Sequence, residues 1–179
     1  MQPEEPVILT PAQKLAVRRY RRLWISRQDL SEAIAAIELI EISGLKRASR
    51  GDHPLDLIIL TTALMVSYAR PFVDTRGKDE LADRTLPGSF LRTLTRPQRE
   101  LHDHMIYMRQ KEIAHSDADA IGLTFRLSPT SESSISRTAR DPLYRKDLQS
   151  LRVIIRKIER QIDRTCLALA KTLPHDTWL

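Results

Sequence analysis

The chain has 179 residues, enough for one domain with a substantial core but too few for two ordinary domains. Its 41% hydrophobic content excludes a disordered chain, and its 5 glycines and many Leu, Ile, Ala, Arg and Glu residues favour helices. The net charge of +6 suits an anionic partner such as nucleic acid, and the single cysteine, Cys166, excludes an internal disulfide.

The sequence therefore predicts an all-α protein, an antiparallel bundle of four to five main helices with two long loops. We expect one domain over 1–179, with a loose leader at 1–9 and a loose tail at 174–179. The start is acidic and lacks the basic-then-apolar order of a signal peptide. The longest apolar run, Leu57 to Ala69, is shorter than the ~20 residues of a membrane span. We expect a cytoplasmic protein without a membrane partner.

The first predicted helix opens with a capping box, Thr10 to Gln13, and a proline at its first position. Tyr20 and Trp24 fall on its apolar stripe and are expected to face the core. Five cations within nine residues occupy the other face: Lys14, Arg18, Arg19, Arg21 and Arg22. Either a phosphate contact or a solvated basic face explains them.

A second capping pattern, Asp29 to Glu32, starts a new helix or continues the first, and Gly44 ends it. The next helix, 54–69, is apolar almost all round, which predicts a place at the centre of the bundle. Arg70 ends it before Pro71. That arginine complements the helix dipole or contributes to a functional site.

Residues 72–89 have no sustained period and predict a long loop, which tightens into a short helix near 89–94. A second long connection, 118–141, contains alternating Leu123, Phe125 and Leu127, a pattern compatible with a hairpin. The last helix is predicted from about Tyr144 to Leu173.

The most informative segment is 97–117, read as one helix with a capping box from Thr95 to Gln98. Its last two turns carry Arg109, Lys111 and His115. Cations at this end also complement the helix dipole, which explains them without a ligand.

Arg109-Gln-Lys-Glu-Ile-Ala-His115 resembles the Arg-x(4–6)-His motif of the HEPN superfamily, helical nucleotide-binding and ribonuclease domains that include toxin-like members. In topology the resemblance covers roughly 28–173, and at residue level only this segment. The same spacing occurs at Arg47/His53, Arg96/His102 and Arg99/His104, but only Arg109/His115 lies late in a long amphipathic helix, before a helix exit.

The resemblance implies an RNA-directed domain acting as a metal-independent endoribonuclease of toxin or defence type, with Arg109 and His115 as catalytic residues. Gln110, Lys111 and Arg70 are the substrate-binding candidates. It implies a homodimer, RNA as partner, an antitoxin or regulatory protein, and no cofactor. The alternative is a non-catalytic helical dimerisation or interaction module.

Geometry limits how the pair works. Six residues place Arg109 and His115 about 120° apart around an α-helix. Either the helix loosens at Ala114, or each side chain meets its counterpart from a second subunit, as the resemblance implies. His would then take the proton of a ribose 2′-hydroxyl and Arg would bind the phosphate.

Other chemistries lack a pattern. His104 and His115 share a face but lie about 16 Å apart along the helix, too far for one metal ion, and His102 and His104 point to opposite sides. We therefore expect surface histidines and no metal. No nucleophile elbow or glycine-rich phosphate loop occurs.

Overall fold

A computed structural model describes residues 9–44, 54–74, 82–114, 123–126, 134–137, 143 and 145–173. The long helices are α1 (Pro11–Ile42), α2 (Leu55–Ala69), α3 (Arg96–Met108) and α5 (Arg145–Ala170), and a 3-10 helix, η1, spans Gly88–Leu91. The helical bundle confirms the all-α prediction, and none of the helices in these ranges is long and apolar enough to cross a bilayer.

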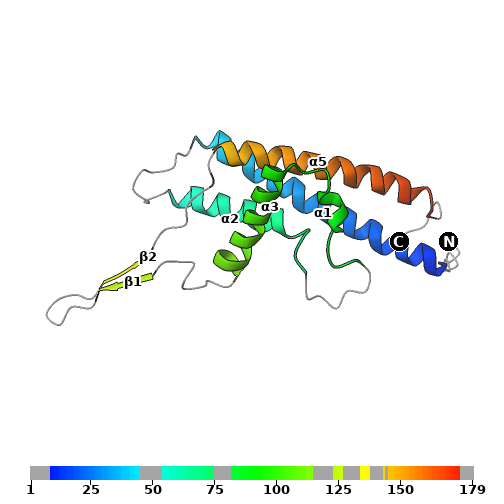
Figure 1. Cartoon of the computed structure of the whole chain (residues 1–179), viewed down its shortest axis with the longest axis horizontal. Helices are drawn as coiled ribbons and strands as arrows, with labels where there is room; N and C mark the ends of the chain where they lie inside the picture. The colour runs from blue at the N-terminus through cyan, green and yellow to red at the C-terminus, as the bar shows by residue number, and fades with distance from the viewer. Residues whose placement is uncertain are drawn as a thin grey trace, which may run out of the picture.

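Figure 1 shows α1, α2 and α5 lying roughly along one direction, with α1 running opposite to both neighbours. Two ion pairs join α1 and α5 in antiparallel order: Arg27 pairs with Asp163 at 2.7 Å, and Glu41, further along α1, pairs with Arg152, earlier in α5, at 2.6 Å. Helix α3 instead runs across this layer (Figure 1), contacting α2 and α5. The bundle is therefore only partly antiparallel.

Two of the three predicted capping boxes are confirmed, those at Thr10 and Thr95. The Thr10 backbone N–H donates to Gln13 Oε1 at 2.9 Å, and the Thr95 N–H donates to Gln98 Oε1 at 3.2 Å. These bonds satisfy backbone donors that have no partner inside the helix. They fix where α1 and α3 begin, and thereby the register of everything on α3.

Helix α1 is continuous, so the Asp29–Glu32 pattern is not a helix start. Asp29 is buried in the middle of the helix, where it serves a contact to α2. Trp24 is 60% exposed, contrary to the expectation that it faces the core, whereas Leu23 beside it is buried. The predicted apolar stripe is therefore confirmed at Val17 and Leu23 and wrong at Trp24.

The prediction that 54–69 is enclosed on all sides is wrong. Leu55 is 71% exposed and Ile59 is 55% exposed, one helical turn apart on the same face of α2. The opposite face is buried against α1 and α3, through Leu57, Leu64 and Tyr68.

One cluster of buried apolar side chains draws on α1, α2, η1, α3 and α5. Its largest fully buried members are Tyr68, Phe90, Leu23, Leu30, Ile37, Leu64, Met105, Leu151, Ile154, Ile155, Ile158 and Ile162. In the second long connection, β1 (Leu123–Arg126) and β2 (Ser134–Arg137) pair antiparallel, confirming the hairpin (Figure 1).

Candidate functional site

The segment that follows α3 changes its helical form at Arg109. Arg109–Ala114 is a π-helix, η2, which contacts α2. The loosening expected at Ala114 therefore begins five residues earlier. π-Helical turns widen the backbone and are frequent at functional sites. His115 lies outside the described residues.

Arg109 is half-buried at the junction between α3 and η2. Among the described residues, no hydrogen bond or ion pair holds its guanidinium, in contrast to Arg27, Arg70, Arg96 and Arg152, which all pair with carboxylates. Gln110 and Lys111 are exposed on the next two positions. The structure thus keeps these three candidates together on one short segment.

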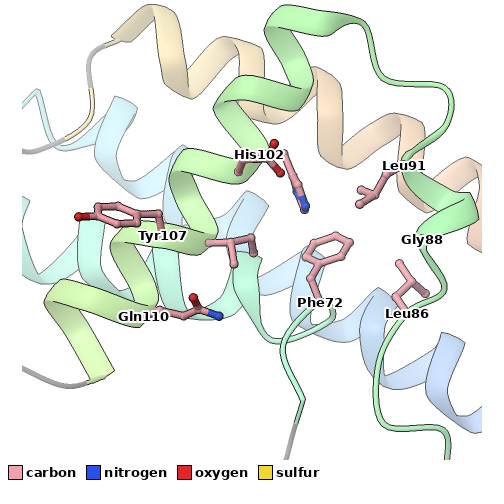
Figure 2. Close-up of a pocket in the computed structure, with 9 residues that line it drawn as sticks. Phe72, Leu86, Gly88, Leu91, His102, Tyr107 and Gln110 are labelled. Atoms are coloured by element: carbon pink, nitrogen blue, oxygen red, sulfur yellow. The ribbon is translucent and has the colours of Figure 1, made fainter.

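A pocket of about 350 Å³ opens beside this segment (Figure 2). One wall comes from α3 and the first turn of η2, and the other from the ends of the loop that joins α2 to α3. Its lining residues are Phe72, Leu86, Gly88, Leu91, His102, Asp103, Ile106, Tyr107 and Gln110. The volume falls in the lower part of the ~300–1,000 Å³ range of small-molecule sites.

The inner end of the pocket is aromatic. His102 and Phe72 meet edge to face with ring centroids 4.7 Å apart, and His102 Nδ1 shares a hydrogen bond of 2.9 Å with the Tyr68 hydroxyl. Figure 2 shows the His102 ring reaching from α3 toward Phe72. His102 is only 4% exposed, so the expectation of a surface histidine is wrong for this residue.

Burial sets the protonation of this pair. Desolvation lowers the pKa of His102, although the nearby Asp103 opposes the shift. Desolvation also raises the pKa of Tyr68, assisted by Asp103. Both groups are therefore neutral near pH 7. Burying a neutral hydrogen-bonded pair costs less free energy than burying a charged one.

A strap formed by Leu86, Gly88 and Leu91 closes the pocket on the side of η1. Arg99 Nη2 donates to the Leu91 carbonyl at 2.8 Å, and Lys157 of α5 donates to Gln98 at 2.8 Å. These bonds tie η1 and the start of α3 to each other and to α5. The part of the pocket wall that contains Leu91 is therefore attached to α3 and, through α3, to α5.

The remaining candidate, Arg70, is engaged elsewhere. Its Nη1 lies 2.9 Å from Glu32 Oε2 and 3.4 Å from Asp29 Oδ1, and its carbonyl accepts a bond of 2.9 Å from Arg22. All these partners are on α1. Arg70 therefore links α1 to α2, while Arg109, Gln110 and Lys111 lie beyond the end of α3.

Burial is the dominant influence within this link. Desolvation raises the pKa of Asp29 against the lowering effect of its bond to Arg70. Desolvation also lowers the pKa of Arg22, whose Nε is buried without a hydrogen-bond partner. The link thus has a buried inner part, Arg22 and Asp29, and an exposed outer part, Arg70 and Glu32, at the α1–α2 interface.

Sequence reasoning missed most of the pocket. Phe72 and Leu86 fall in a stretch without periodicity, and Tyr68 looked like one more core residue of an apolar helix. The one available signal was the spacing of His102, Ile106 and Gln110, which share a row at steps of four. Within the described ranges, no group of three or more His, Cys, Asp or Glu side chains is placed to hold a metal ion.

Comparison of the chain with protein-family models, with curated proteins and with solved structures gave no match in any of the three.

Proposed function

We propose that this protein is an RNA-directed helical domain that cleaves RNA without a metal ion, using Arg109 and His115 in a site shared between two copies of the chain. The observation that carries the proposal is Arg109 itself. Arg109 is half-buried at the junction of α3 and η2, and its guanidinium has no partner among the described side chains. An arginine in that state is available to bind an anion.

The chemistry follows from the two side chains. His115 takes the proton of a ribose 2′-hydroxyl, the 2′-oxygen attacks the adjacent phosphorus, and the bond to the 5′-oxygen breaks. Arg109 binds the phosphate through two N–H groups and stabilises the charge that develops on it. The proton taken by His115 passes to the departing 5′-oxygen, so the products are a 2′,3′-cyclic phosphate and a 5′-hydroxyl, and no oxidant or metal enters the balance.

The charge distribution supports a polyanionic substrate. The first half of α1 carries no acidic residue between Pro11 and Gln28, and Lys14 and Arg19 are exposed there. Phosphate backbones bind such surfaces through release of counterions. This basic part of α1 lies on a different helix from Arg109 and would attract RNA through its phosphate backbone. Such attraction does not depend on the identity of the bases.

A non-catalytic dimerisation module is the second candidate, and the exposed face of α2 favours it. Leu55 and Ile59 present two large apolar side chains to solvent on a helix that contacts η2. A second copy of the chain placed there would bury them near the Arg109 segment. Dimerisation is common to both candidates, so only activity separates them.

The test is incubation of the purified protein with end-labelled single-stranded RNA in EDTA. We expect cleavage to a cyclic phosphate, and a loss of about 100-fold or more in rate for His115→Ala and for Arg109→Ala. His104→Ala and Arg92→Ala are matched controls, because both positions are exposed on or near α3. Intact RNA, or cleavage that survives His115→Ala, would rule out the proposed enzyme.

A further inference from the structure

We propose that the pocket between α3 and the strap formed by Leu86, Gly88 and Leu91 binds a guanine base of a single-stranded RNA. The inference rests on the proposed function, in that RNA is taken as the ligand. It goes beyond it by assigning a base-recognition site, separate from the phosphate-binding Arg109.

The shape of the pocket suits a flat ring. Phe72 and Leu91 supply apolar surface opposite α3, and the row His102, Ile106 and Gln110 forms the facing wall (Figure 2). Single-stranded RNA is recognised by splaying bases out, stacking them on aromatic groups and reading their edges. A pocket of about 350 Å³ between an aromatic ring and a helix accommodates one such base.

The charge at the rim selects a base over a phosphate. Asp103 lines the pocket, is exposed, and makes no hydrogen bond or ion pair with any described residue. A carboxylate repels phosphate oxygens, and it accepts hydrogen bonds without donating any. The Asp103 carboxylate therefore favours a ligand group that donates hydrogen bonds.

Guanine carries the edge that a carboxylate binds best. Its N1–H and N2–H₂ groups are adjacent, parallel donors, so both carboxylate oxygens accept at once, whereas adenine and cytosine offer a single amino group. Gln110 adds an amide that donates to the O6 acceptor from the same wall. His102, kept neutral by burial, adds a ring nitrogen, Nε2, that is not engaged by Tyr68.

Sequence adjacency couples this pocket to the phosphate site. Gln110 lines the pocket and Arg109 directly precedes it on the π-helical segment. We expect a base in the pocket to bring its own or a neighbouring phosphate within reach of Arg109. This arrangement predicts cleavage next to guanine.

The experiment compares GMP with AMP on the intact protein, by calorimetric titration and by shifts of backbone amide resonances. Both nucleotides carry the same phosphate, so any difference reports the base. We expect GMP to bind about tenfold or more tighter, and Asp103→Asn to remove that preference, because a carboxamide accepts at one atom only. Glu38→Gln makes the same charge change at an exposed position of α1 and is expected to leave the preference intact.

A second variant blocks the pocket while leaving the carboxylate. A Cβ placed on Gly88 meets no atom within 4 Å, so the backbone there has room to begin a side chain, and Gly88→Leu adds bulk at the wall. We expect it to weaken GMP binding, with amide shifts lost around residues 102–110. Equal affinities for GMP and AMP in the wild-type protein, or a preference unchanged in Asp103→Asn, would overturn the inference.

The two proposals fail in different ways. Selective GMP binding without cleavage of RNA removes the enzyme but supports the base pocket. Cleavage that depends on His115, together with equal binding of GMP and AMP, removes the pocket and leaves the enzyme.

Discussion

His102 shows how strongly one side chain depends on its surroundings. From the sequence it is one of several histidines on a charged helix, yet in the structure it is buried between Phe72 and Tyr68. The polar Nδ1 atom is tolerated there because the Tyr68 hydroxyl satisfies it. The pair thus joins α2 to α3 at the base of the pocket.

Removing that hydroxyl has a calculable cost. We expect Tyr68→Phe to lower the free energy of unfolding by about 1–3 kcal/mol, because it leaves a buried imidazole nitrogen without a partner. Urea denaturation measures the change. Tyr107→Phe deletes a hydroxyl from a side chain that is 54% exposed and is expected to change stability by less than about 0.5 kcal/mol. Equal effects for the two variants would contradict the assigned role of Tyr68.

The lowered pKa of His102 also predicts a pH dependence of stability. Because its pKa in the folded state lies below the ordinary value of 6.5, the unfolded chain binds a proton first as the pH falls. This contribution to stability is complete above about pH 6.5 and is lost progressively below it. Replacing His102 by Gln should flatten the profile between about pH 7 and pH 5 in urea unfolding, whereas His104→Gln, at an exposed position, should preserve it.

At the scale of elements, the contact between α1 and α2 combines two buried charged groups, Arg22 and Asp29, with two exposed ones, Arg70 and Glu32. Arg70 reaches two carboxylates, of which Asp29 has a side chain 12% exposed and Glu32 a side chain 46% exposed. The shorter contact, 2.9 Å, is to the more exposed acid. Burial and distance therefore make opposite predictions about which acid contributes more.

We expect burial, and not distance, to determine which of the two acids contributes more to stability. Asp29→Asn should cost about 2 kcal/mol or more, because it leaves Arg22 and Arg70 beside an uncharged group in a desolvated place. Glu32→Gln should cost less than about 1 kcal/mol, since solvent screens the pair. Thermal or urea unfolding of the two variants gives the comparison, and a larger loss for Glu32→Gln would show that distance dominates.

Local sequence predicted the parts of the fold that local physics controls. The capping boxes at Thr10 and Thr95 and the alternation at Leu123 and Phe125 depend on near neighbours, and the structure confirms each. The helix start predicted at Asp29 was wrong, because a carboxylate that forms an ion pair with another helix has the same local sequence pattern as a helix cap. The π-helix at Arg109 was not predicted, because its 6 residues are too few to display a period different from that of the α-helix before it.

At the scale of the whole molecule, the sequence identified Arg109, Gln110 and Lys111 as one segment, but it did not assign the opposite wall of the pocket. That wall comes from Phe72, just after the end of α2, and from Leu86 and Leu91 in the aperiodic connection before α3. Long-range packing leaves Leu55 and Ile59 exposed, which residue periodicity alone does not reveal. Leu55 and Ile59 form the surface on which the proposed second copy would dock.

A shared site between two copies makes a prediction that a site within one copy does not. If each site takes Arg109 from one subunit and His115 from the other, a heterodimer of Arg109→Ala and His115→Ala subunits contains one intact site and one doubly altered site. Co-refolding equal amounts makes half of the dimers mixed, so the expected recovery is about a quarter of wild-type activity. If each site lies within one subunit, no mixture recovers activity.

The measurement is the rate of RNA cleavage in EDTA, before and after the two inactive variants are unfolded together and refolded. Each variant refolded alone is the control, and it should stay inactive. Mass determination by light scattering confirms that dimers have re-formed, so that a failure to recover activity is assigned to the site and not to assembly. Activity in the mixture but not in either control would place the guanidinium and the imidazole on different subunits.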